Sequence, residues 1–167
     1  AHMAGAFTFG TAGTAEKLSQ AAELGLDIGI NYREDDFARA IQERTHGRGV
    51  DVVFDLVGPS YWEGNITSLA MCGRIVLVSS LGGNEMNVDL GLLIPKRGSL
   101  HATVLRTRTL QEKLLLTDQF RRQLLPFFAN GLLRPIVDRV FPLEEVVAAH
   151  KYLASNANFG KIVLTLE

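Results

Sequence analysis

Cysteine and histidine are scarce in this sequence. Its 167 residues include one cysteine, Cys72, and four histidines, which stand far apart at positions 2, 46, 101 and 150. A single cysteine forms no disulfide within the chain and cannot supply the several thiolates of a structural zinc site. We therefore expect no metal site, and a reducing compartment, the cytoplasm.

Long runs of basic or apolar residues are also missing. The formal net charge is -1 and no basic stripe occurs, so nucleic acid is not expected as a partner. No apolar stretch reaches the roughly 18 residues that a membrane span needs. No charged, hydrophobic leader opens the sequence, so we expect no secretory signal. The first three residues, Ala-His-Met, have two interpretations: a remnant of a cloning vector, or the end of a native helix.

The sequence does contain short apolar runs that alternate with segments of helical periodicity, and 47% of its residues are hydrophobic. Strands alternating with helices predict an α/β fold with a parallel sheet covered on both faces. The β-branched run at 50–58 is typical of a strand buried on both faces. Strands are expected at 6–10, 27–31, 50–58, 73–80, 99–105, 134–142 and 161–167, and helices at 14–24, 35–45, 61–71, 88–94, 109–130 and 143–154.

The opening turn, Gly10 to Lys17, has two interpretations from its residues alone. As a phosphate loop it offers only two glycines, Gly10 and Gly13, without the G-x-G-x-x-G spacing. As the end of a second strand it would lie beside an adenosine ribose. Thr14 is a plausible N-cap, but Lys17 stands where a capping box has Glu or Gln, so its charge opposes the helix dipole. A bound phosphate would offset that cost; otherwise Lys17 extends into solvent.

Taken together, the residues resemble the quinone oxidoreductase branch of the medium-chain dehydrogenase/reductase superfamily, the zinc-free and NADPH-dependent group. The matching pieces run in family order along the chain: MAGA (3–6), GTAGTAEK (10–17), INYREDDF (30–37), GVDVVFDLVG (49–58), YWEGN (61–65), GRIVLVS (73–79), KRGSL (96–100), AHKYL (149–153) and FGKIVL (159–164).

The resemblance implies a Rossmann-type, doubly wound parallel sheet that lacks its first strand. In the family, GTAGTAEK follows the second strand, so this chain is expected to be a C-terminal fragment. Residues 1–131 would form a partial dinucleotide-binding domain. Residues 132–167 would belong with an absent catalytic domain.

The resemblance also implies which residues bind NADP(H). Lys17 matches a lysine that contacts the 2′-phosphate, and Tyr32 a tyrosine at the same phosphate. Arg33 could add charge there, but a solvated side chain is the simpler interpretation. Asp55 is expected to cap nearby backbone N–H groups. The expected cofactor-binding residues are Gly13, Thr14, Ala15, Lys17, Tyr32, Val57, Gly58, Ser80, Leu81, Gly82, Gly83, Leu105, Phe159 and Gly160. No catalytic acid or base stands out, and Trp62 is most simply a residue of the core or of the packing of its helix.

The implied reaction is hydride transfer from NADPH to a quinone or another α,β-unsaturated carbonyl, with the fragment alone inactive. Two alternatives remain: a relative of the enoyl-thioester reductases, or a non-catalytic nucleotide-binding module. The strand at 99–105 is the sheet edge in the family, so a homodimer through it is expected.

A missing first strand has a structural consequence. In the strand order 3-2-1-4-5-6, strand 1 separates the segment 6–10 from the segment 51–56. We expect one of three outcomes: the missing strand is present as a separate piece, another chain takes its place, or the two segments pair directly.

Overall fold

The structure is a computed structural model that describes residues 1–166. It contains two compact units, Ala1–Thr107 and Arg108–Glu167. The predicted boundary after residue 131 concerns how a whole protein would divide, and it stays a prediction.

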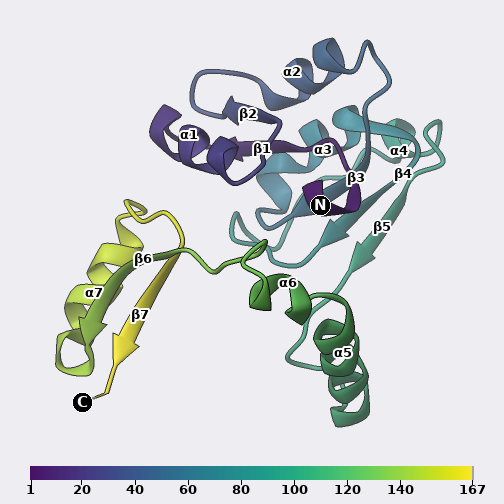
Figure 1. Ribbon diagram of the computed structural model, residues 1–167. Coiled ribbons are helices and arrows are strands. Elements are labelled where there is room, and N and C mark those ends of the chain that lie inside the picture. Colours follow the sequence, from purple (N-terminus) through teal and green to yellow (C-terminus); the bar gives the residue numbers. More distant parts are fainter. Residues whose placement is uncertain (167) are drawn as a thin grey trace. The chain divides into compact units, whose positions relative to one another are not determined.

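The first unit begins with a strand–helix–strand segment (Figure 1). After a 3₁₀ turn, η1 (His2–Ala4), strand β1 (Phe9–Ala12) pairs in parallel with β2 (Ile28–Asn31). Helix α1 (Ala15–Glu23) connects them and packs on β2, where the side chain of Leu18 lies against Gly29. The helix begins at Thr14, whose hydroxyl accepts a hydrogen bond from the Lys17 N–H at 3.3 Å, as an N-cap does.

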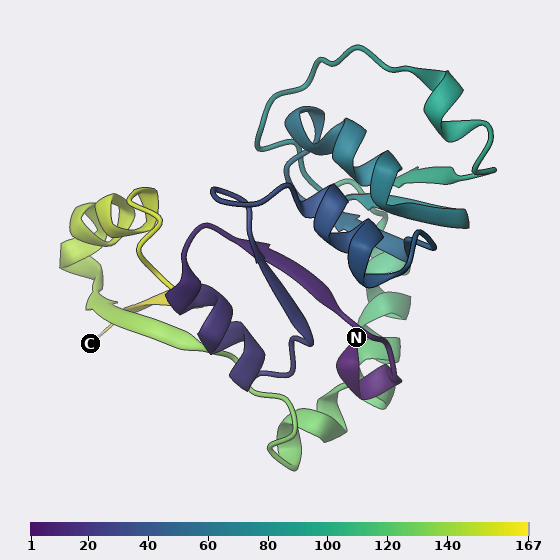
Figure 2. The ribbon, with the colours of Figure 1, turned by 90° about the horizontal axis from the view of Figure 1, so that it is seen from above.

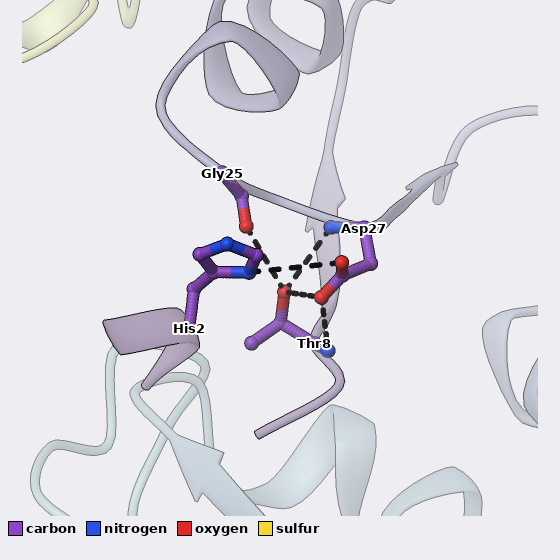
Figure 3. Close-up of polar contacts among 4 residues, drawn as sticks. All are labelled: His2, Thr8, Gly25 and Asp27. Atoms are coloured by element: carbon purple, nitrogen blue, oxygen red, sulfur yellow. Dashed lines mark hydrogen bonds and ion pairs between the residues drawn. The ribbon is translucent and has the colours of Figure 1, made fainter. Parts of the chain in front are cut away.

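The amino ends of β1 and β2 are joined by a polar cluster of four residues (Figure 3). Asp27 Oδ2 accepts hydrogen bonds from the Thr8 N–H and hydroxyl, both at 2.7 Å, and His2 Nδ1 lies 3.7 Å from Asp27 Oδ1. The Thr8 hydroxyl also lies 3.4 Å from the Gly25 carbonyl oxygen. This cluster holds the two strands in register at the end opposite the Gly13 turn.

The second sheet of the first unit consists of three parallel strands, β3 (Val50–Asp55), β4 (Leu69–Leu77) and β5 (Ser99–Ala102). The turn η2 (Pro59–Tyr61) and helix α3 (Trp62–Ser68) connect β3 to β4, and α4 (Leu90–Leu93) precedes β5. Trp62 is 7% exposed and packs with Ile66, Leu69 and Ile75, so its predicted place in the core is confirmed. The predicted parallel α/β fold is confirmed as well.

Two predictions about β3 and α3 are wrong. The run at 50–58 is not buried on both faces, because Val53 packs against the core cluster while Val52 and Phe54 are 43% and 66% exposed. Within the first unit only one face of this sheet is packed. The helix predicted at 61–71 ends at Ser68, because Leu69 is already the first residue of β4. Leu69 pairs there with Val50 of β3, and its side chain is 1% exposed.

Strands β1 and β3 do not pair with each other among the described residues, because they belong to different sheets. Direct pairing, one of the three expected outcomes, therefore does not occur in this structure. The two sheets are connected instead through α2 (Phe37–Arg44), which packs against α3 (Figures 1 and 2). Each of the two strands keeps one edge whose backbone groups are not paired with another strand of the described chain.

The second unit begins with α5 (Leu110–Gln123) and α6 (Leu125–Ala129), which are separated at Leu124, two residues before Pro126. The single helix predicted at 109–130 is therefore divided in two, because a proline ring disrupts the interior of a helix. Strand β6 (Val137–Pro142) pairs in parallel with β7 (Lys161–Thr165), and η3 (Leu143–Glu145) and α7 (Val146–Ala154) connect them. The Tyr152 hydroxyl donates to Asp138 Oδ2 at 2.8 Å, which ties α7 to β6. No helix within residues 1–166 is long and apolar enough to cross a membrane.

Candidate nucleotide-binding site

Gly13 lies at the carboxyl end of β1, where two side chains from the end of β2 approach it closely. A carbon atom added to Gly13 would lie 2.7 Å from Tyr32 Oη and 3.0 Å from Arg33 Nε. A side chain at this position would displace the ends of these two flexible side chains. Ligands of parallel α/β sheets bind at the carboxyl ends of the strands, so this is the expected place for a site.

Five of the predicted cofactor-binding residues meet at this end of the small sheet. Gly13, Thr14 and Ala15 form the turn and the first residue of α1, and Lys17 is the third residue of that helix. Tyr32 follows β2 and is tied to β1 by a hydrogen bond from its N–H to the Ala12 carbonyl at 3.2 Å. The unsatisfied N–H groups of a helix N-terminus favour an anion, and both Lys17 and Arg33 add positive charge here.

A second cluster of predicted residues lies where β3 and β4 end. The Gly82 N–H donates to the Val57 carbonyl at 2.8 Å, and the Leu81 N–H donates to the Leu56 carbonyl at 3.2 Å. Gly58 has φ +83, a left-handed conformation that favours glycine. The structure thus brings Val57 and Gly58 together with Ser80, Leu81, Gly82 and Gly83, and Leu81 is 80% exposed.

Asp55 holds this second cluster together. Its Oδ1 accepts hydrogen bonds from the N–H groups of Val57 at 2.7 Å and Gly58 at 3.0 Å, and its Oδ2 accepts one from Asn65 Nδ2 at 2.9 Å. The side chain is buried, and these three bonds satisfy it. The predicted capping role of Asp55 is therefore confirmed.

Tyr61 connects the two clusters, although the sequence pattern did not single it out. Its N–H donates to the Gly58 carbonyl at 2.9 Å, while its ring centroid lies 6.4 Å from that of Tyr32 and 5.1 Å from that of Phe37. Burial, and then the proximity of Tyr32 and Asp55, raise the pKa of Tyr61. In the sequence, the only feature that could have pointed to Tyr61 as a site residue is its place shortly after the turn Gly58-Pro59.

The remaining predicted residues lie elsewhere. Leu105 follows β5 and is 58% exposed. Phe159 and Gly160 belong to the second unit, where the Phe159 N–H donates to Asp138 Oδ1 at 3.0 Å. Gly160 has φ +103, and a carbon atom added to it would lie 2.5 Å from the Ile136 carbonyl oxygen. The backbone conformation and this close contact both explain why a glycine occupies the position. Their role toward a cofactor stays a prediction.

Residues 1–166 offer no set of ligands for a zinc site. Within the described part of the chain, no three histidine, cysteine or acidic side chains come close enough to hold a metal ion. His101 lies in β5 with Nε2 at 3.1 Å from the Ser99 hydroxyl, His46 lies in a turn, and His150 is exposed on α7.

Comparisons with known proteins agree in pointing to one family. The family model described as zinc-binding dehydrogenase matches residues 24–164. The chain is 35% identical over 164 residues to a 2-haloacrylate reductase of Burkholderia sp, covering 96% of this chain and 48% of that protein. It is 34% identical over 165 residues to quinone oxidoreductase 1 of Escherichia coli strain K12, covering 96% and 49%.

Solved structures of oxidoreductases are similar to this chain as well. The structure of Escherichia coli quinone oxidoreductase complexed with NADPH matches 95% of this chain and 49% of that chain, with a TM-score of 0.78 and 34% identity. A structure described as an NAD-dependent alcohol dehydrogenase matches 99% and 46%, with a TM-score of 0.83 and 30% identity. The chain thus spans about half the length of the relatives that it matches.

Proposed function

Because the chain belongs to the zinc-binding dehydrogenase family, we propose that it is the cofactor-binding part of an NADPH-dependent quinone oxidoreductase. The observation that carries this proposal is the convergence of Tyr32, Arg33 and the start of α1 on Gly13. A nucleotide with an additional phosphate on its ribose matches this arrangement better than one without. The relatives named 2-haloacrylate reductase and quinone oxidoreductase support the reaction class.

The proposed preference for NADP(H) over NAD(H) follows from the charges at the end of β1. NAD-specific sites place an acidic residue there to accept hydrogen bonds from the ribose hydroxyls. This chain has Gly13 and Thr14 instead, followed by Lys17 in the first turn of α1. In our proposal the Lys17 ammonium and the Tyr32 hydroxyl donate hydrogen bonds to the 2′-phosphate, and the dipole of α1 adds to the attraction.

The second cluster would position the rest of the cofactor. Val57 and Gly58 are proposed to lie along the adenosine, and Ser80 to Gly83 nearer to the nicotinamide. A carbon atom added to Gly82 would lie 2.9 Å from Ser60 Oγ and 3.1 Å from the Val57 carbonyl oxygen, so this side of the turn lies against Val57 and Ser60. Leu105 is proposed to lie toward the nicotinamide end, and the cofactor-binding role of Phe159 and Gly160, in the second unit, stays a prediction. NADPH, when bound, supplies the hydride, and the protein groups position it and shape the pocket.

No acid or base in this chain is assigned to the reaction, and the described residues supply no metal ligands to it. We propose that the substrate, a quinone or an enone, is bound largely by a catalytic domain outside this chain. The protein would act in the cytoplasm as a homodimer formed through β5. The net charge of -1 gives no reason to expect nucleic acid as a partner.

Two alternative functions share the same fold. The protein could reduce enoyl thioesters, because fold alone does not distinguish between reductases built on one scaffold. It could also be a nucleotide-binding module without activity. The identity to a 2-haloacrylate reductase favours an enzyme that acts on α,β-unsaturated carbonyls over the module.

The test is NADPH oxidation by the full-length protein that contains this chain. A simple quinone, a 2-haloacrylate and an enoyl thioester are supplied in separate assays. Oxidation with the quinone, faster with NADPH than with NADH, is the expected result. Turnover with the thioester alone would favour the first alternative, and NADPH binding without oxidation of any acceptor would favour the second.

A further inference from the structure

Arg33 differs from the other charged residues of its loop. It is followed by three acidic residues, Glu34, Asp35 and Asp36, yet its guanidinium lies against Gly13 on the other side of the turn. Asp36 accepts hydrogen bonds from the N–H groups of Ala38 and Arg39 and so caps α2. Among residues 1–166 Arg33 forms no ion pair, so its charge is available to a ligand.

The backbone around Arg33 is held in place. The buried side chain of Asn31 accepts a hydrogen bond from the Arg33 N–H at 3.2 Å, and the Asn31 carbonyl accepts bonds from the N–H groups of Glu34 and Asp35 at 3.1 and 2.9 Å. These bonds close a tight turn directly after β2. The Arg33 side chain therefore starts from a fixed point beside the Gly13 turn, which lowers the entropy lost when it binds a ligand.

The chemistry of this position points to a phosphate group. Tyr32 Oη and Arg33 Nε lie near each other at Gly13, 2.7 and 3.0 Å from the place that a Gly13 Cβ would take, so one phosphate beside them could accept hydrogen bonds from both. A guanidinium presents a fork of N–H donors that matches two oxygens of one phosphate, which a lysine ammonium does not. A phosphomonoester carries close to two negative charges at neutral pH, so one lysine leaves part of its charge uncompensated.

We propose that Arg33 is a specificity-determining residue that binds the ribose 2′-phosphate and selects nucleotides carrying it. This inference rests on the proposed function, and it adds a residue that the sequence favoured as merely solvated. Lys17 reaches the phosphate from α1, and Arg33 reaches it from the turn after β2. The two cations thus come from two different elements and both depend on the pairing of β1 with β2.

The test titrates the 167-residue chain with adenosine 2′-monophosphate and, separately, with adenosine 5′-monophosphate, and follows backbone amide shifts by NMR. Neither probe contains a pyrophosphate group, so the binding of neither depends on a pyrophosphate-binding loop. We expect the 2′-phosphate to bind more tightly and to shift the amides of Gly13, Thr14 and Arg33. Arg33→Ala should weaken 2′-monophosphate binding about tenfold, the value of one charge-assisted hydrogen bond. It should leave 5′-monophosphate binding unchanged.

Three further variants separate the possible outcomes. Arg33→Lys should recover part of the affinity because it retains the charge without the fork of donors. Arg39→Ala removes an exposed arginine that is paired with Glu43 on α2, and it should leave the binding of both probes unchanged.

If Lys17→Ala weakens binding but Arg33→Ala does not, the role of Arg33 is refuted while the proposed function stands. If the wild-type chain does not distinguish the two probes, and neither variant changes binding, the proposed function fails as well.

Discussion

Single residues decide the shape of the candidate site, and glycine does so for two different physical reasons. Gly58 has a positive φ and is needed for its backbone conformation. Gly13 does not have a positive φ; a side chain there would meet the ends of the Tyr32 and Arg33 side chains, which would have to shift. We expect Gly13→Ala to displace these two groups, whereas the Thr14 hydroxyl sets where α1 begins.

Lys17 carries the prediction on cofactor preference. In the full-length protein, Lys17→Ala should weaken NADPH binding and leave NADH binding almost unchanged, because only NADPH presents the phosphate. A hydrogen bond to a charged group contributes about 1.5–3 kcal/mol, which sets the size of the expected loss. Binding is measured by titration calorimetry with both cofactors. An equal loss for NADH and NADPH would contradict the assignment.

Asp27 carries a prediction on pH. Hydrogen bonds from the Thr8 hydroxyl and N–H, and then the nearby His2, hold the pKa of Asp27 below its ordinary value of 3.8 (Figure 3). A lowered pKa means that the ionised carboxylate stabilises the folded state above pH 3.8 and that this contribution is lost as the pH falls further. Asp27→Asn should therefore lower the melting temperature at pH 7 and flatten its decrease in acid.

The matched control for Asp27 is Asp35→Asn, which removes an exposed carboxylate from the loop before α2. Thermal unfolding is followed by circular dichroism from about pH 7 down to about pH 3, the range in which ordinary carboxylates titrate. The control should keep the wild-type pH profile. If Asp27→Asn keeps it too, the polar cluster does not stabilise the fold.

At the level of elements, an exposed strand edge is the feature that favours association with another chain. Strand β5 pairs with β4 along one side, and all four of its residues are exposed. An exposed edge presents unpaired N–H and C=O groups to any strand that can approach it. A twofold-related copy of β5 could extend the sheet continuously across two chains.

Ala102 tests the proposed dimer. The Thr103 N–H donates to the Leu77 carbonyl in β4 at 3.0 Å. Because N–H groups alternate in direction along a strand, the Ala102 N–H faces the open edge. Ala102→Pro removes this donor without removing a bond to β4, so it should convert a dimer to a monomer in ultracentrifugation. Ala102→Thr, which keeps the N–H, should remain dimeric. A wild-type monomer whose β5 amides exchange freely with solvent would refute pairing through this edge.

On the scale of the whole chain, the separation of the two sheets in the first unit is the main structural fact. Strands β1 and β3 belong to different sheets, which are connected through α2, α3 and the rings of Tyr32, Tyr61 and Phe37. The strand order β2-β1 and β3-β4-β5 agrees with the order 3-2 and 4-5-6 of a doubly wound sheet. One central strand would complete it.

That missing strand carries the phosphate loop of a doubly wound sheet, so the chain alone should bind NADPH poorly. Titration calorimetry on the purified 167-residue chain should show binding weaker than micromolar. Micromolar affinity or better would mean that the turn from Gly10 to Lys17 is itself the phosphate loop, and that the placement of β1 as a second strand is wrong.

The sequence by itself determined those features that depend on neighbouring residues. Thr14 and Thr109 begin helices because a hydroxyl can accept a hydrogen bond from an N–H three residues later in the chain. Asp55 caps the turn that follows it for the same local reason. The order of strands and helices, and the family to which they belong, could also be recognised from the residues alone.

Only the tertiary structure decided which distant residues meet. The place of Arg33 against Gly13 depends on the pairing of β1 with β2, and that of Tyr61 against Tyr32 depends on the packing of α2 against α3. No periodicity within one segment encodes either contact. The exposure of Val52 and Phe54 likewise depends on what covers the sheet and not on their own hydrophobicity. Hydrogen bonds of caps and turns act over three or four residues, whereas burial and convergence of side chains are properties of the packed molecule.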